Sequence, residues 1–410
     1  MNTISNNYGF YKMYKSKKAI DLFCGCGGIS VGLEQTGFEL LAGMDIEKKY
    51  LASFKHNFPK AKALNIDITQ TAPSEFMDLV EITTNKLDIL VGGPPCQGFS
   101  KNVPLKNRYL HDPKNLLVNS FLDYCEVLRP KMILMENVAE MKNGFEKAYS
   151  QEVISRLENE GYTVTSIVLN AADYGVPQRR RRAFFIANQY GLKFESPLPT
   201  HYAQSKESSE IYNLFFSNPQ HITVWDAIGD LPELEHGEGQ KLTTYKTLPQ
   251  NSYQEFMRGN CESVTNHIAR KLQPIQHERL SSLEAGQGLK DLPIHLQTKG
   301  GYSGAYGRLT KDMIAPTITR WVFHPGSGRW GHPVDIRTLT MREVARIQSF
   351  PDKYEFVGSY NEQAGQLGNA VPPLLAKIII QSMNTQLERF KKETKSSQLT
   401  FSVDNLNAMA

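Results

Sequence analysis

The segment that most restricts the fold is an apolar strand followed by a glycine-rich turn and a helix. Residues 19–23 predict the strand, residues 24–28 the turn, and residues 29–37 have helical spacing closed by a glycine. This order opens the nucleotide-binding half of a doubly wound parallel sheet. The turn is not G-x-G-x-x-G and lacks the lysine of a phosphate-binding loop, so a pyrophosphate ligand is not expected.

Acidic residues end the next two predicted strands. Residues 40–44 lead to Asp45, about 20 residues beyond the turn, where a carboxylate would bind ribose hydroxyls. Asp67 and Ile68 follow a third strand, and Phe23 is placed to lie against a cationic ligand group. Glycine turns and strand-end acids occur in any α/β protein, so each feature alone is weak. Together they favour an adenosine-type cofactor without phosphates, which points to S-adenosylmethionine.

A fourth strand, residues 87–91, ends in two glycines and two prolines that cannot extend a sheet, and Cys96 follows at once. A thiol on a rigid turn suits a nucleophile, although a lone cysteine more often only packs. Residues 97–113 are polar and carry Lys101 and Arg108. They predict either a lid that meets a phosphate backbone or a solvated loop.

Polar residues also follow two later strands. Residues 132–135 lead to Glu136, and strands at 163–169 and 183–187 flank a run of four arginines. If the strand begins within this run, alternation places Gln178, Arg180 and Arg182 on one face. A solvated basic patch is the usual alternative, but this run passes directly into an apolar strand.

The composition of the chain says more about the cellular compartment in which it folds than about its function. Five scattered cysteines in 410 residues do not form a disulfide framework, so we expect a reducing cytoplasm. Cys24 and Cys26 lack a second pair to complete a metal site, and no metal is expected. We see neither a membrane-spanning apolar run nor a signal segment. A net charge of +4 permits a polyanionic partner without demonstrating one.

Five motifs together resemble the DNA (cytosine-5) methyltransferase family of prokaryotic restriction-modification type. They are Asp21-Leu-Phe-x-Gly-x-Gly-Gly28, Gly93-Pro-Pro-Cys-Gln-Gly-Phe-Ser100, Glu136-Asn-Val138, Gln178-x-Arg-x-Arg182 and Gly365-Gln-x-Gly-Asn-Ala-Val-Pro372. The resemblance covers residues 19–189 and 332–390 in the family order. Adenine and N4-cytosine methyltransferases carry Pro-Pro-Tyr or Pro-Pro-Trp without a catalytic thiol, whereas this chain has cysteine there.

The resemblance implies a Rossmann-like methyltransferase domain with a smaller, irregular target-recognition domain. It implies that Cys96 attacks cytosine C6, that Glu136 binds N3, and that Arg182, with Arg180, binds O2 of a flipped base. The cofactor positions it implies are Phe23, Gly25, Gly27, Gly28, Asp45, Ile46, Asp67, Ile68, Gly93, Pro95, Leu116, Asn369, Ala370 and Val371. The implied DNA contacts are Gln97, Ser100, Lys101, Arg108, Gln178, Arg308 and Thr317.

Asn369–Val371 lie far from the other cofactor positions in the chain, so the large domain is expected to be discontinuous. The expected parts are a flexible leader (1–18), the first catalytic part (19–189), the recognition domain (190–331), a scaffold motif (332–360), the returning catalytic part (361–390) and a loose tail (391–410). Thr340 and Glu343 predict a capping box. A helix over 373–390 should pack against the first helix, and loops 266–271 and 299–308 should face DNA.

The resemblance implies methyl transfer from S-adenosylmethionine, with S-adenosylhomocysteine as product, to cytosine C5 in a short sequence of double-stranded DNA. A cognate restriction endonuclease, without a stable complex, is the expected functional partner of a cytoplasmic monomer. Two alternatives stay open. One is a tRNA cytosine-5 methyltransferase, whose short target region with a Cys-Phe-Thr element is absent here. The other is an inactive DNA-binding scaffold, against which the intact Cys96, Glu136 and Arg182 argue.

Overall fold

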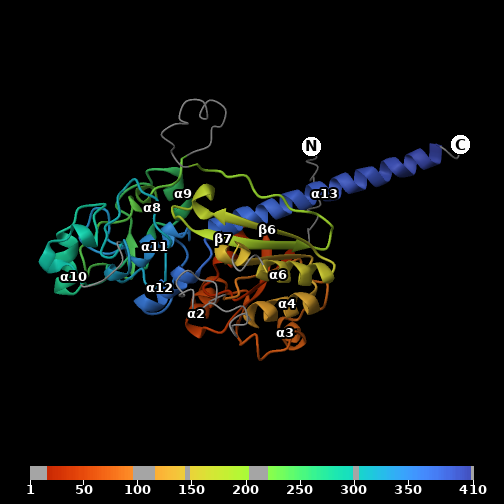
Figure 1. Cartoon of the computed structure of the whole chain (residues 1–410), viewed down its shortest axis with the longest axis horizontal. Coiled ribbons are helices and arrows are strands. Elements are labelled where there is room, and N and C mark those ends of the chain that lie inside the picture. Colours follow the sequence, from red (N-terminus) through yellow and green to blue (C-terminus); the bar gives the residue numbers. More distant parts are fainter. Residues whose placement is uncertain (1–15, 96–115, 144–147, 203–219, 299–303, 408–410) are drawn as a thin grey trace, which may run out of the picture.

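The structure is a computed structural model that describes residues 16–95, 116–143, 148–202, 220–298 and 304–407 (Figure 1). Its centre is a sheet of seven strands in the order β3-β2-β1-β4-β5-β7-β6. The strands are β1 (Lys17–Leu22), β2 (Phe38–Asp45), β3 (Lys62–Asn65), β4 (Ile89–Gly92), β5 (Met132–Val138), β6 (Thr163–Asn170) and β7 (Arg181–Asn188). All pairings are parallel except those of β7, which runs antiparallel to both of its neighbours. The predicted doubly wound α/β class is confirmed.

Alternation along the strands divides the core into two layers. Ile89 and Val91 of β4 pack on one face of the sheet, whereas Leu90 packs on the other. The first face is covered by α1 (Gly28–Gln35), α2 (Lys48–Asn57) and α13 (Pro373–Asn407), and the second by α3 (Pro73–Val80), α4 (Leu116–Leu128) and α6 (Ala148–Asn159). A strand buried on both faces reads as a continuous apolar run, which explains why these strands could be recognised in the sequence.

Short elements and long connections replace the regular pattern beyond β7. They include α8 (Val224–Ile228), a small hairpin of β8 (Leu242–Thr244) and β9 (Ser263–Thr265), α9 (Ser252–Arg258) and α10 (Pro274–Ser281). A separate small cluster of leucines, Ala305 and Tyr306 forms a second core near α10, far from the sheet (Figure 1). The irregular character expected of this half agrees with the structure.

Buried arginines join this half to the scaffold helix α11 (Met341–Ile347). Arg346 forms ion pairs with Asp230, which precedes the hairpin, and with Asp352, and all three side chains are buried. Arg337 donates to both carboxylate oxygens of Glu343, at 2.9 and 2.8 Å. Glu343 also completes the predicted capping box with Thr340. Buried charges need such complete pairing, because an unpaired one is strongly destabilising.

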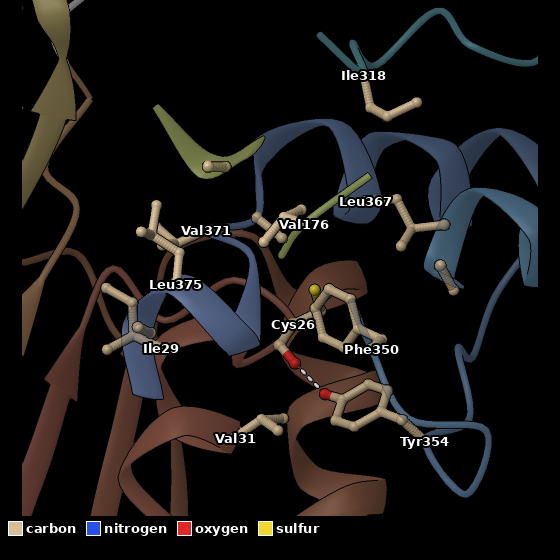
Figure 2. Close-up of a cluster of buried hydrophobic side chains, with 14 of the residues drawn as sticks. Cys26, Ile29, Val31, Val176, Ile318, Phe350, Tyr354, Leu367, Val371 and Leu375 are labelled. Atoms are coloured by element: carbon tan, nitrogen blue, oxygen red, sulfur yellow. Dashed lines mark hydrogen bonds between the residues drawn. The ribbon is translucent and has the colours of Figure 1, made fainter. Parts of the chain in front are cut away.

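The returning part packs directly on the first glycine turn. Figure 2 shows Leu367 of α12 (Tyr360–Asn369), Val371 and Leu375 in one apolar cluster with Cys26 and Ile29. In the same view, Tyr354 donates a hydrogen bond to the Cys26 carbonyl. A Cβ on Gly32 of α1 would lie 2.9 Å from the Ala376 side chain. The predicted packing of the last helix against the first is confirmed.

Two predicted boundaries are wrong. Lys17 and Lys18 belong to β1, where Lys18 pairs with Glu39 and its amide donates to Asp88, so they are not part of a leader. The chain from 391 to 407 continues the helix α13 and is not a loose tail. That stretch lacks glycine and proline, which usually mark a helix end, although its polar composition led us to expect a loose end.

Candidate active site

The carboxyl ends of β1 and β2 are tied together at the glycine turn. The Gly25 amide donates to Asp45 Oδ2 at 2.8 Å, and the Cys24 amide donates to the Met44 carbonyl at 3.0 Å. Phe23 at the start of the turn has φ of 60°, and Gly27 has φ of 89°. Glycine adopts this left-handed conformation without strain, and a Cβ on Gly27 would also lie 2.6 Å from the Phe58 ring. The turn therefore needs glycine for both its conformation and its packing.

Asp21, one residue before the end of β1, is a candidate site residue that sequence reasoning missed. Its Oδ2 accepts from the Ser30 hydroxyl of α1 at 2.5 Å, but its buried Oδ1 has no hydrogen-bond partner within the described chain. Burial raises the pKa of Asp21 to about 7. An orphaned carboxylate oxygen beneath a ligand-binding turn fits a cationic group. The sequence signal that could have identified Asp21 is a charged residue inside an otherwise apolar strand, Ile20-Asp21-Leu22.

The returning segment completes the same edge. A Cβ on Gly28 would lie 2.3 Å from the Val371 carbonyl, and the Cys26 thiol donates to the Gln366 carbonyl at 3.7 Å. Ala370 and Val371 are nearly buried there, whereas Asn369 is exposed. Predicted cofactor positions from the beginning and end of the chain thus meet at one turn.

A cavity of about 600 Å³ lies beside the third strand end and holds two more of these positions. It is lined by Ile68, Thr69, Gln70, Thr71, Ala72, Pro73, Leu116, Ser120, Asp123 and Tyr124. Leu116 is 56% exposed and Ile46, at the end of β2, is 61% exposed. The Asn65 side chain donates to the carbonyls of Asp45 and Ile46, which links β3 to β2. The Asp67 carboxylate accepts hydrogen bonds from the amide and the hydroxyl of Thr69. An exposed apolar side chain just after β2 and another at the start of α4 suit contact with a ligand ring.

The second part of the site lies where β4 and β5 end. The Asn137 side chain donates to the Pro94 carbonyl at 3.0 Å, and a Cβ on Gly93 would lie 3.2 Å from Glu136 Oε2. Pro95 is exposed. The chain therefore turns beside Glu136 immediately before Cys96, which lies outside the described residues.

Glu136 and Arg182 form the ion pair of this region. Arg182 Nε lies 2.7 Å from Glu136 Oε1, and the two side chains are 16% and 12% exposed, respectively. In the antiparallel register Arg182 faces Val138 and Glu136 faces Phe184, so the two charged residues are diagonal neighbours on one face of the sheet. A guanidinium held against a carboxylate at an accessible edge can bind adjacent acceptor and donor atoms of a planar ligand.

Arg180 and Gln178 do not join this pair. β7 begins at Arg181, so alternation does not extend back to them. Arg180 is buried and donates to the carbonyls of Ile318 and Gly368, at 3.0 and 3.1 Å. Gln178 is buried, accepts from the Ile318 amide and donates to Gln348. The predictions of a catalytic Arg180 and a DNA-contacting Gln178 are therefore corrected: both hold the segment around Ile318 in place.

The predicted DNA contact Arg308 is also corrected. It is 7% exposed, and its guanidinium donates to the carbonyls of Leu283, His332 and Val334. In the loop 266–271, His267 is fully buried between Thr340 and the Pro232 carbonyl. Thr317 is partly exposed and its hydroxyl donates to the Arg179 carbonyl, and its contact with DNA stays a prediction.

Several predicted positions fall outside the described residues. These are Cys96, Gln97, Ser100, Lys101 and Arg108, the leader up to residue 15, and residues 299–303 of the second loop. Within the described ranges, no group of three or more His, Cys, Asp or Glu side chains is arranged to hold a metal ion. In the same part of the chain, no helix is both long and apolar enough to cross a bilayer.

Comparison with known proteins agrees with this arrangement. Residues 17–385 match the model of the C-5 cytosine-specific DNA methylase family. The type II methyltransferase M.AgeI of Thalassovita gelatinovora is 32% identical over 90% of this chain and 100% of its own length. M1.HphI of Haemophilus parahaemolyticus, also a type II methyltransferase, is 34% identical over 89% of this chain and 87% of its own length.

Solved structures support the fold. A DNA modification methyltransferase encoded within a prophage (E. coli) superposes with a TM-score of 0.70 at 24% identity, over 91% of this chain and 100% of that one. The S. pombe Dnmt2 methyltransferase superposes with a TM-score of 0.54 at 17% identity, over 92% and 99% of the two chains. With the family match extending over most of its length, the chain belongs to the C-5 cytosine-specific DNA methylase family.

Proposed function

We propose that this DNA (cytosine-5)-methyltransferase transfers a methyl group from S-adenosylmethionine to C5 of one cytosine in a short, specific sequence of double-stranded DNA. The observation that carries the proposal is the Glu136–Arg182 pair beside the Gly93–Pro95 turn, because that turn leads directly to Cys96. A nucleophile, a guanidinium and a carboxylate are the groups that this reaction requires around a pyrimidine ring.

The residues at the glycine turn fit the cofactor. The Asp21 Oδ1 oxygen would accept from its amino group, Asp45 would bind the ribose hydroxyls, and Ile46, Ile68 and Leu116 would contact the adenine. Asn369, Ala370 and Val371 would close this edge from the returning segment. The cofactor supplies an electrophilic methyl group on a sulfonium sulfur.

The chain's own residues would prepare cytosine to accept that methyl group. The Cys96 thiolate forms a bond to C6, and the electron pair of the C5–C6 double bond moves into the ring, so that C5 becomes nucleophilic. Glu136 would hydrogen-bond N3 and Arg182 would bind O2, which stabilises the charge that develops there. After transfer, loss of the C5 proton restores the double bond and releases Cys96. Because C5 and C6 are stacked within a duplex, the base must be flipped out.

The type II methyltransferases among its relatives suggest the biological setting. We infer that methylation protects host DNA from a cognate restriction endonuclease that recognises the same sequence. The two enzymes would share a DNA sequence and would not need a stable complex.

Methyl transfer should be measured with labelled S-adenosylmethionine on mixed-sequence plasmid DNA and on tRNA, followed by conversion sequencing. We expect 5-methylcytosine in one short duplex motif, and no transfer with Cys96→Ser. A duplex with 5-fluorocytosine at the mapped position should remain covalently bound, because C5 then has no proton to lose. Labelling of tRNA alone would overturn the substrate, and wild-type activity in Cys96→Ser would overturn the mechanism.

A further inference from the structure

Arg320 differs from every other arginine in the region from 220 to 350. Eight of the nine arginines there donate hydrogen bonds to protein carbonyls or carboxylates, namely Arg258, Arg270, Arg279, Arg308, Arg329, Arg337, Arg342 and Arg346. Arg320 is exposed, and its guanidinium has no hydrogen bond or ion pair to any residue that the structure describes. Its contact is with the ring of Trp321, 5.1 Å from the guanidinium carbon.

Trp321 differs from the other two tryptophans in a similar way. Trp330 is buried and donates from its indole nitrogen to Ser327, and Trp225 is half-buried beneath Lys311. Trp321 is 53% exposed. An exposed indole beside a guanidinium that has no hydrogen-bond partner among the described residues suits a surface that a polar partner covers.

The backbone places these two residues at the edge of the active site. A Cβ on Gly368 would lie 2.2 Å from the Arg320 amide nitrogen, so this segment lies directly against the end of α12, next to Asn369. Arg180, which lies two residues before Arg182 in the chain, donates a hydrogen bond to the Ile318 carbonyl. Burial raises the pKa of Tyr50 on α2, and the charge of Arg320 opposes part of that increase. Arg320 therefore lies between the cofactor edge and the recognition half.

We propose that Arg320 binds a backbone phosphate of the DNA duplex and that Trp321 packs against the adjoining nucleotide, so that together they position the duplex at the active-site edge. The proposal rests on the proposed function, since it needs duplex DNA as the substrate. A phosphate fits a guanidinium with all its donors free. The indole offers an apolar face to a sugar or base without reading sequence.

The two contacts differ in their dependence on salt, and this difference provides the test. DNA affinity would be measured by fluorescence anisotropy from 50 to 200 mM salt for wild type, Arg320→Gln, Trp321→Ala and Trp321→Phe. Arg389→Gln, exposed on α13, is the matched control. For Arg320→Gln we expect the slope of log K against log salt to become less steep by about 0.9, the value for one phosphate contact. The KM for DNA should increase about tenfold, with the loss in KM and not in kcat.

Trp321→Ala should weaken binding about tenfold with an unchanged salt slope, and Trp321→Phe should restore most of the affinity. Indole emission of the wild type should be quenched by DNA, and that quenching should disappear in Trp321→Phe. Equal melting temperatures would confirm that the variants fold.

Two results would overturn the proposal. One is an Arg320→Gln enzyme with wild-type slope and affinity, and the other is a loss confined to kcat. If wild-type enzyme methylates duplex DNA while these variants behave like wild type, only this inference fails. If wild type neither binds nor methylates duplex DNA, the proposed function fails with it.

Discussion

Arg182 Nε lies 2.7 Å from Glu136 Oε1, across two antiparallel strands that bring residues 46 positions apart in the chain onto one face of the sheet. In the proposed mechanism the carboxyl binds N3 and the guanidinium binds O2. The Glu136→Gln side chain keeps the shape of glutamate but cannot share a proton with N3 of the base as a carboxyl group can. We expect kcat to fall about 10²- to 10⁴-fold while DNA and cofactor dissociation constants stay within about threefold. Glu152→Gln, exposed on α6, is the control; a Glu136→Gln enzyme at full rate would remove Glu136 from the mechanism.

Asp21 predicts a pH dependence of cofactor binding. Burial raises its pKa from an ordinary value of 3.8 to about 7. Between about pH 4 and pH 7 the native protein therefore holds this proton, whereas the unfolded chain has lost it. The contribution of protonated Asp21 to stability decreases as the pH rises through 7. Since only the carboxylate attracts a cationic amino group, calorimetry should show S-adenosylhomocysteine binding about tenfold tighter at pH 8 than at pH 6. Asp21→Asn should bind weakly with a flatter profile, and an unchanged profile would refute the assignment.

The close contact between Gly368 of α12 and the backbone at Arg320 predicts that a side chain added at position 368 is destabilising. An alanine at an unobstructed helix position is ordinarily more stable than glycine by up to about 1 kcal/mol. Here the added Cβ would meet backbone, the Arg320 amide, at 2.2 Å. We expect Gly368→Ala to be destabilised by about 2 kcal/mol in urea unfolding and to weaken DNA binding. In Gly365→Ala the Cβ would meet the end of the Tyr50 side chain at 2.5 Å, so adding Tyr50→Phe should relieve that variant but not Gly368→Ala.

The buried ion pairs around Arg346 predict a large loss on removal of one partner. Asp230→Asn leaves Arg346 and Arg258 short of a carboxylate in a site without access to water. We expect a loss of about 3–5 kcal/mol in the free energy of unfolding. Arg389→Ala breaks a pair whose side chains are 77% and 61% exposed, and should change stability by less than about 0.5 kcal/mol. Similar losses for the two variants would contradict this account.

His332 predicts sensitivity to acid. Burial lowers its pKa to about 4, so the unfolded chain binds this proton at higher pH than the native protein does. The stabilising contribution of His332 is fully present above about pH 6.5, the pKa of histidine in the unfolded chain. It decreases as the pH falls towards 4, the pKa in the native protein. The shift corresponds to roughly 3 kcal/mol. The difference in unfolding free energy between wild type and His332→Gln should therefore shrink from pH 7 to pH 4; a constant difference would show that His332 does not titrate in this range.

The sequence predicted the sheet well because its strands are short apolar runs bounded by glycine, proline and acid. Asp45 and Glu136 were predicted as site residues for the same reason, since a polar residue that ends such a run is conspicuous. Arg308 and Arg180 were misjudged because an arginine that binds backbone carbonyls has the same local sequence as one that meets a phosphate. Only the fold shows which carbonyls are within reach. Asp21 was missed as a ligand because its orphaned oxygen depends on how α1 lies over β1.

The closure of the glycine turn by Val371 has a consequence for the order of biosynthesis. About 180 residues separate the end of β7 from that contact, and a ribosome adding about 5–20 residues per second needs roughly ten to forty seconds to make them. During that interval all seven strands have been synthesised, but the apolar side of α1 still lacks its cover. Under the proposed function, the pocket for the methyl donor would be closed only after the segment between β7 and Val371 has been synthesised.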